Sequence, residues 1–263
     1  MGERKNYHRG RRKKKKGGII STLILIIAIA VFCVSGYQLY KIFGGYHQGK
    51  SEYDKVREVA VHGDDKDEDE FVVDFDELKK INADTVGWIR FYPEPSQISY
   101  PLVQTTDNDL YLNRTFSANE NTVGAIFVNC DNAADFSDRN TIIYGHRMKD
   151  HSMFHDLEKY EDESFWKENP YFYIYTPDGR KLSCHIYSAG IVKDTSSTYL
   201  TQFASDEEYQ AFLDDTKRAG AYHTGVEVTT DQRVVTLSTC TAASDDNRMV
   251  VRGVIESEDV VKK

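Results

Sequence analysis

Cysteine is scarce in this chain of 263 residues, which contains only four. Cys33 falls inside a long apolar run, which leaves Cys130, Cys184 and Cys240 for the rest of the chain. Because three is an odd number, at least one thiol is unpaired or pairs between molecules. The sequence therefore fits a disulfide framework poorly. Two readings stay open, a reactive thiol and cysteines that serve as small buried hydrophobic residues.

The chain also lacks an excess of positive charge, since its net charge is −9, which argues against a general nucleic-acid-binding protein. The exception is the first 16 residues, which hold nine Lys and Arg against one acidic residue, a formal +8. The other 247 residues carry the difference, −17. Such asymmetry indicates that the two ends of the chain face different surroundings.

A charge-free run from Ile19 to Tyr40 follows the basic block. About 20 apolar residues in a helix cross the hydrocarbon core of a bilayer. Basic residues before a span stay on the cytoplasmic side, so residues 1–18 are predicted to be a cytoplasmic tail and 19–40 a single-pass signal-anchor in the cell membrane. Cleavage near Val34–Gly36, as in a signal peptide, is the alternative.

Residues 41–70 are predicted to be a linker between the span and the folded domain. Gly44 and Gly45 follow the span, and Gly63–Glu70 is an acidic run with nothing to bury. The run lacks the spaced Asp-x-Asp-x-Asp-Gly pattern of a calcium loop. The folded, extracellular domain is expected to cover residues 71–258.

Short strand-like runs dominate this domain, and their density favours a closed barrel or a sandwich. Apolar spacing predicts helices over Phe75–Asn82, Ser152–Tyr160 and Ser205–Ala219, the last opening with a capping box of Ser205 and Glu208. The predicted strands are Val86–Phe91, Ile98–Gln104, Ala125–Asn129, Asn140–Tyr144, Tyr171–Thr176, Lys181–Ile191, Gly225–Thr229, Arg233–Ser238 and Arg248–Ile255.

Three strands deliver chemically useful residues to their ends. Val234–Cys240 ends in a cysteine, Thr141–Tyr144 leads through a glycine to His146, and the strand from Arg248 opens with an arginine. A thiolate can attack, an imidazole can move the proton, and a guanidinium can stabilise negative charge on a carbonyl oxygen. Spacing alone does not show that the three meet, and each has an ordinary structural reading.

The histidines do not predict a metal centre. His146, His151 and His155 mix spacings of five and four, unlike the His-Glu-x-x-His pattern of zinc proteases. We expect no metal and no cofactor.

The segments around the cysteine, arginine and histidine resemble the sortase family. Thr236–Cys240 with Asn247–Val251 is similar to the cysteine and arginine signature of sortases, and Asn140–Met148 is similar to their histidine motif. The likeness is strongest to class B, in unbroken order over about residues 75–256. Segments that also resemble class B are Ile81–Ile89, Tyr100–Gln104, Asn108–Asn113 and Gly124–Phe127.

The resemblance implies a mainly β fold, an eight-stranded barrel with an N-terminal helix and an added helix near 205–219. It implies a cysteine transpeptidase of Gram-positive bacteria. Such an enzyme cleaves the C-terminal sorting signal of surface proteins through a thioacyl-enzyme. It then transfers the protein to an amine of the peptidoglycan precursor. The implied partners are those two substrates and the membrane, with no nucleic acid.

By motif, the resemblance implies Cys240 as the nucleophile, His146 as the general acid and base, and Arg248 as the residue that stabilises the oxyanion. Arg252, on the same face of its strand, is the competing arginine, and Arg252→Ala is expected to stay within a few-fold of wild type. Residues that resemble substrate-contacting positions are Asn113, Tyr144, Thr195, Tyr199 and Ser238.

Other functions stay open at this point. A pilin-linking sortase would use the same residues, although no second apolar span follows the domain. An L,D-transpeptidase also uses a cysteine, but Thr239 stands where its Ser-x-Gly-Cys pattern has glycine. A membrane-tethered binding domain would need no reactive thiol.

Overall fold

The computed structural model describes residues 17–63, 70–244 and 246–261. Most of the basic tail and most of the acidic run lie outside these ranges. By internal contacts the chain divides into two compact units, with the boundary between Gly44 and Gly45.

The first long helix, α1, covers Gly17–Ala60. Its large apolar side chains from Leu23 to Tyr40, and that of Phe43, are exposed. Of the helices in the described part of the chain, α1 alone is long and apolar enough to cross a membrane. The structure thus contains one candidate span where the sequence predicts a signal-anchor.

The second half of α1 differs from the linker expected over residues 41–70. Tyr53, Val56 and Ala60 are buried in the core of the folded unit. The Tyr53 hydroxyl donates to the Gly124 carbonyl at 2.8 Å and accepts from the Phe116 amide at 3.1 Å. The folded unit therefore begins at Gly45, well before Phe71. The residues from Tyr46 to Ala60 that face the core recur every three or four positions, a helical pattern that signals burial.

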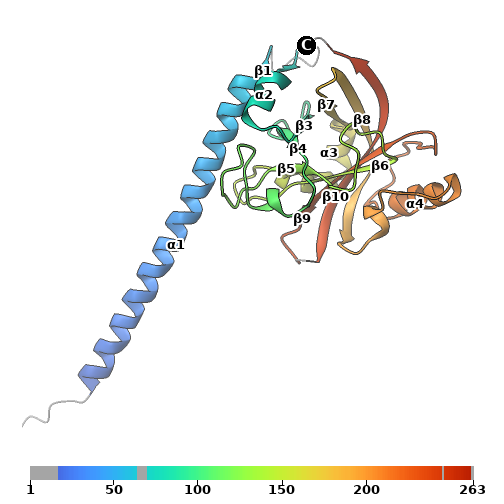
Figure 1. Cartoon of the computed structure of the whole chain (residues 1–263). Coiled ribbons are helices and arrows are strands. Elements are labelled where there is room, and N and C mark those ends of the chain that lie inside the picture. Colours follow the sequence, from blue (N-terminus) through green and yellow to red (C-terminus); the bar gives the residue numbers. More distant parts are fainter. Residues whose placement is uncertain (1–16, 64–69, 245, 262–263) are drawn as a thin grey trace, which may run out of the picture. The chain divides into compact units, whose positions relative to one another are not determined.

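Eight strands close into a barrel in the order β10-β8-β7-β3-β4-β5-β6-β9 (Figure 1). This confirms the closed barrel and eight of the nine predicted strands. The barrel strands are β3 (Thr85–Phe91), β4 (Ser99–Val103), β5 (Ile126–Val128), β6 (Asn140–Tyr144), β7 (Tyr171–Tyr175), β8 (Arg180–Lys193), β9 (Val234–Cys240) and β10 (Asn247–Val260). Two short strands, β1 (Val61–His62) and β2 (Val72–Val73), form a separate antiparallel pair. They lie between α1 and the first barrel strand in the chain.

Two helices form where predicted. The Asp74 side chain accepts from the Glu77 amide and so caps α2 (Phe75–Ile81). Ser205 accepts from the Glu208 amide at the start of α4 (Asp206–Arg218), while the Glu208 carboxylate accepts from the Ala204 amide. The remaining helical segments are α3 (Glu163–Glu168) and the 3-10 turns η1 (Leu110–Leu112), η2 (His155–Glu161) and η3 (Ser197–Tyr199).

Two other predictions from apolar spacing were wrong. Residues 225–229 pair with no strand, because Val226 and Val228 instead pack into the apolar cluster beneath α4. The segment 152–160 is an irregular turn that becomes η2, with His151 and Met153 at positive φ. Its Met153, Phe154, Leu157 and Tyr160 are nevertheless all completely buried, so the stripe identified core residues without identifying the helix type.

Apolar side chains form two clusters. The larger fills the barrel and includes Trp88, Phe91 and Phe172. The smaller one attaches α4 to the barrel through Tyr209, Phe212 and Leu213. Because α4 is held by its own apolar cluster, the segment between β8 and β9 is a packed part of the domain.

Gly253 on β10 is closely packed in the barrel wall. A Cβ at this position would lie 2.6 Å from the Phe172 ring and 2.8 Å from the Cys184 Cβ. We predict that Gly253→Ala lowers the free energy of unfolding by about 1–3 kcal/mol, since the Cys184 Cβ is fixed to its strand and the buried Phe172 ring would have to shift within the core. Urea unfolding of the detergent-solubilised chain measures this. Gly44→Ala, where nothing lies within 4 Å, is the control. Equal stability of the two variants would contradict the prediction.

Candidate active site

Strand β9 carries Cys240 to the surface of the barrel. Residues Val234 to Thr239 are buried, and only the last residue of the strand, Cys240, is exposed. The β-branched residues before it suit a strand that is paired on both sides. The strand thus holds its backbone in the wall and presents one thiol at its end.

The pairing of β9 with its two neighbours brings the predicted residues together. Strand β6 runs parallel to β9 with Tyr144 opposite Ser238, and the Gly145 amide donates to the Ser238 carbonyl at 3.2 Å. His146 and Cys240 each follow two residues after this last pair. On the other side, the antiparallel register places Arg248 opposite Cys240.

A cleft of about 240 Å³ opens where the three strands meet. It is lined by Asn108, Leu112, Phe127, Tyr144, Gly145, His146, Ser238, Thr239, Cys240 and Arg248. A larger cavity of about 450 Å³ lies beside the end of α1, but neither a cysteine nor His146 lines it. The chemistry of the lining residues, and not the volume, identifies the smaller cleft as the candidate active site.

His146 is held by the backbone. Its Nε2 lies 2.6 Å from the Leu112 carbonyl oxygen. Because a carbonyl oxygen only accepts, Nε2 carries the proton, so in the neutral ring the lone pair is on Nδ1. Gly124, at φ +66, lets the chain pass close to the ring, since a Cβ there would lie 2.7 Å from the His146 Cδ2.

The two arginines of β10 have different surroundings. Arg248 lines the cleft with a side chain one quarter exposed, and its Nη2 lies 3.8 Å from an Asp194 carboxylate oxygen. Arg252 is completely buried and donates to the hydroxyls of Ser188 and Thr198. The expectation that Arg252→Ala is a neutral control is therefore corrected, because the variant would lose several buried hydrogen bonds.

Three of the five residues predicted to contact substrate lie together at the cleft. Tyr144 and Ser238 line it, and the Tyr199 hydroxyl lies 2.9 Å from the Ser238 hydroxyl. The rings of Tyr144 and Tyr199 are stacked, with centroids 6.3 Å apart. Burial raises the pKa of Tyr144 to about 12, so its hydroxyl stays protonated at neutral pH.

The other two predicted contacts, Asn113 and Thr195, are exposed and do not line the cleft. Asn113 follows Leu112, whose carbonyl binds His146, and Thr195 lies in the turn between β8 and η3.

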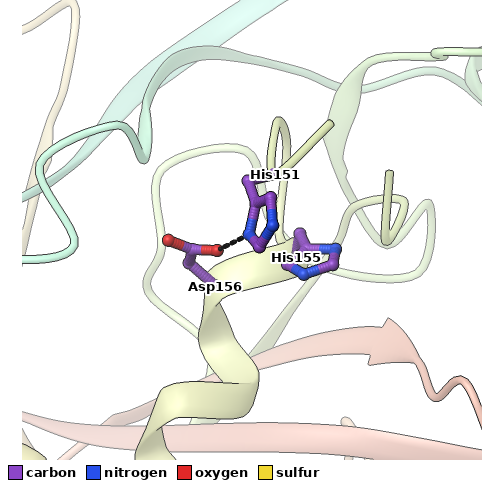
Figure 2. Close-up of side chains that lie close together, drawn as sticks. All are labelled: His151, His155 and Asp156. Atoms are coloured by element: carbon purple, nitrogen blue, oxygen red, sulfur yellow. Dashed lines mark hydrogen bonds and ion pairs between the residues drawn. The ribbon is translucent and has the colours of Figure 1, made fainter. Parts of the chain in front are cut away.

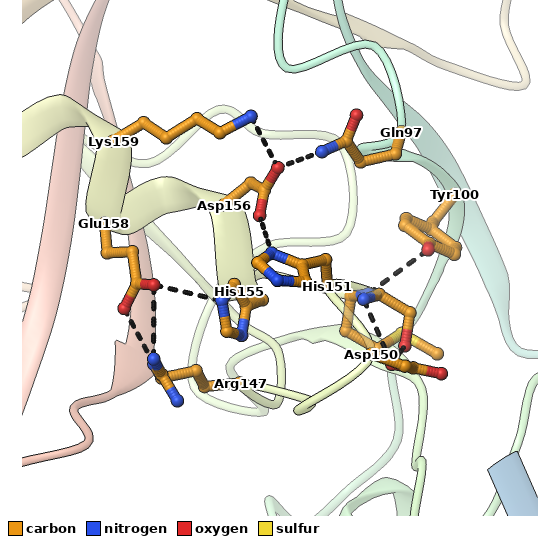
Figure 3. A network of polar contacts seen from close by, with 11 residues as sticks. Gln97, Tyr100, Arg147, Asp150, His151, His155, Asp156, Glu158 and Lys159 are labelled. Carbon is orange, nitrogen blue, oxygen red and sulfur yellow. Dashed lines mark hydrogen bonds and ion pairs between the residues drawn. The ribbon is translucent and has the colours of Figure 1, made fainter.

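A polar network anchors the segment that follows His146 (Figures 2 and 3). Potential metal-binding atoms of His151, His155 and Asp156 lie within 4.8 Å of one another. Asp156 already accepts from His151, Lys159 and Gln97, and His155 Nε2 lies 3.0 Å from a Glu158 oxygen. With these partners in place, the cluster acts as the anchor of this loop.

Sequence reasoning missed the backbone groups that frame His146. The Leu112 carbonyl and the close approach at Gly124 involve no side chain whose type could reveal them. Arg147 and Glu158, which form a two-pronged ion pair across the loop, were also missed. They are eleven residues apart, too far to touch within a single helix or strand, so no local pattern indicates the pair.

A thiol, an imidazole and a guanidinium around one cleft, on a closed β-barrel, define a cysteine enzyme able to form and resolve a thioester. The model of the sortase domain matches residues 94–256. Sortase B of Listeria monocytogenes is 32% identical over 242 residues, which is 88% of this chain and 94% of that protein.

Solved structures agree. The sortase B chain of the Staphylococcus aureus sortase B–substrate complex is 35% identical to this chain, with a TM-score of 0.65. The match covers 72% of this chain and 85% of the sortase B chain. A sortase B complexed with triglycine gives 35% identity and a TM-score of 0.65, over 72% of this chain and 86% of that one.

The chain belongs to the sortase family, and its relatives are class B enzymes. It is therefore a cysteine transpeptidase. This replaces the alternatives of an L,D-transpeptidase and of a binding domain without catalysis.

The cysteines outside the apolar helix should differ in their reaction with iodoacetamide at neutral pH. Cys240 is exposed, whereas Cys184 is buried and its pKa is raised by that burial. Burial also raises the pKa of the half-buried Cys130. We expect Cys240 to be modified first, Cys130 more slowly, and Cys184 only in denaturant. Peptide mass spectrometry measures the order, and modification of Cys184 as fast as Cys240 would contradict it.

Proposed function

We propose that this sortase cleaves a C-terminal sorting signal on secreted surface proteins and joins the new carboxyl end to an amine of the cell-wall precursor. The observation that carries the proposal is the convergence of Cys240, His146 and Arg248 on one cleft through the register of β6, β9 and β10. The sortase B complexes with a substrate and with triglycine, a peptide that offers an α-amino group, support the two substrate classes.

In the first half-reaction, the Cys240 thiolate attacks the carbonyl carbon of the scissile peptide bond. Negative charge moves to the carbonyl oxygen, where the Arg248 guanidinium stabilises it. The carbon–nitrogen bond then breaks, and His146 donates a proton to the departing amine. The product is a thioester on Cys240.

In the second half-reaction, the acceptor amine attacks the thioester carbon and gives a proton to His146. The carbon–sulfur bond breaks, the Cys240 thiolate leaves, and a new peptide bond remains. The Leu112 carbonyl keeps the ring oriented through both steps, because it binds the His146 nitrogen that does not need to change its proton.

We infer that Tyr144, Tyr199 and Ser238 form the wall that receives the sorting signal. Tyr144 and Ser238 border the cleft, and Tyr199 is joined to Ser238. Asn113 and Thr195 are assigned to the two approaches, where an extended peptide would enter and leave.

The proposed location is the cell membrane, with residues 19–40 as a single-pass anchor, the tail 1–18 in the cytoplasm and the catalytic domain outside. The long apolar helix and the basic block before it support this orientation.

Cys240→Ala should abolish cleavage of sorting-motif peptides, because Cys240 carries the only thiol among the described residues that line the cleft. His146→Ala should be nearly as severe, since the leaving amine would depart without a proton. Chromatography of peptide products measures both, and unchanged near-ultraviolet circular dichroism shows that the fold is intact. Cleavage by Cys240→Ala at the wild-type rate would refute the mechanism.

Arg248→Ala should lower the cleavage rate by about a hundredfold or more, the order seen when an oxyanion donor is lost. Arg248→Lys should recover only part of it, because an ammonium lacks the planar fork of a guanidinium. Arg218→Ala, an exposed arginine on α4, is the matched control and should keep the wild-type rate. A rate for Arg248→Ala within a few-fold of that control would show that another residue stabilises the oxyanion.

Protease added to intact cells should remove the chain beyond residue 45 and spare residues 1–18, as measured with antibodies to each part. Protection of the catalytic domain until the cells are lysed would reverse the proposed orientation.

A further inference from the structure

Arg252 is a buried cation at the centre of a polar network. Its side chain is completely buried on β10, and the hydrogen-bond acceptors described for it are two hydroxyls and a carbonyl rather than a carboxylate. Burial lowers the pKa of the guanidinium, although a neighbouring pair of tyrosines, Tyr187 and Tyr199, opposes this. Burying a cation without a counterion is unfavourable, so the hydrogen bonds it makes must carry a structural benefit.

Those hydrogen bonds join three elements that are distant in sequence. Nη1 donates to the Ser188 hydroxyl on β8 at 3.0 Å and, at 3.5 Å, to the Thr216 carbonyl on α4. Nη2 donates to the Thr198 hydroxyl on η3 at 2.6 Å. The guanidinium therefore ties the segment between β8 and β9 to the barrel wall.

A second polar side chain also holds η3. The Asn140 amide group on β6 donates to the carbonyls of Thr198 and Leu200, at 3.1 and 2.8 Å. Its oxygen accepts from the Thr236 hydroxyl on β9 at 2.8 Å. The turn is thus fixed by residues on the strands that also carry the cysteine, the histidine and the active-site arginine.

These contacts hold η3 and thereby position Tyr199. It follows Thr198 directly, and its hydroxyl lies 2.9 Å from that of Ser238, two residues before Cys240. Its ring stacks on Tyr144, which borders the cleft. A shift of η3 would therefore move one wall of the cleft without moving the thiol.

We propose that Arg252 is a positioning residue that sets the affinity for the peptide substrate by fixing Thr198, and with it the Tyr199 wall. It acts through η3 and touches none of the reacting atoms. The inference rests on the proposed function, since it requires a peptide in this cleft.

Two isosteric or smaller substitutions within the network separate positioning from stability. Thr198→Val and Ser188→Ala each remove one hydroxyl that accepts from Arg252, but only Thr198 lies on η3. The assay uses the full chain in detergent and, of a set of sorting-motif peptides, the one that wild type cleaves fastest. Thr198→Val should raise KM about tenfold, the order for losing a hydrogen bond to a charged group. Its kcat should change less than threefold. Ser188→Ala should leave KM within twofold of wild type. It should lower the melting temperature by about as much as Thr198→Val does.

Arg252→Lys completes the test as a double-mutant cycle. It should raise KM as Thr198→Val does, and the double variant should be no worse than Arg252→Lys alone, because both remove the same contact. Equal KM changes in Ser188→Ala and Thr198→Val, or additive effects in the cycle, would overturn the inference and leave the proposed function standing. Failure of wild type to cleave any peptide would overturn the proposed function, and this inference with it.

Discussion

The position of β9 between β6 and β10 is the constraint on which the candidate active site depends. Its parallel pairing with β6 fixes where His146 leaves the barrel, and its antiparallel pairing with β10 sets Arg248 opposite Cys240. A slip of one residue on either side would turn alternate side chains into the core and separate the set. Tight packing at Gly253, against Phe172 and Cys184, is one reason that β10 keeps its register with β8.

We propose different roles for the two arginines that lie four residues apart on β10, one in the reaction and one in the structure. Arg248, at the mouth of the cleft, is near solvent and can meet charge that develops on a substrate. Arg252 is buried and uses its donors on Ser188, Thr198 and Thr216. The wall beside the cysteine is therefore held from within the barrel. A preformed wall reduces the ordering that a bound peptide would otherwise have to impose.

Much of the barrel could be predicted from the sequence, because most of its strands read as β-branched or aromatic runs between turn residues. Recognition of the site came from the motifs around Cys240 and His146. The errors came from residue patterns that are compatible with more than one local conformation. Val226 and Val228 alternate as in a strand but pack under α4, and the stripe ending at Tyr160 is core without being a regular helix. The spacing of Tyr53, Val56 and Ala60 signalled a packed helix that the neighbouring glycines and acids obscured. The contact of His146 with the Leu112 carbonyl has no signal in the sequence, since every residue has a backbone carbonyl.

The central claim is that the acyl group of the sorting signal passes through Cys240. Intact-mass spectrometry of the wild-type chain, quenched in acid during turnover of a cleaved peptide, tests it most directly. We predict a mass increase equal to the N-terminal fragment of the peptide, located on Cys240 by digestion. Addition of a glycine peptide should discharge it, and the same fragment should appear joined to that amine. Steady cleavage with no such adduct, or with the acyl group on another residue, would contradict the account.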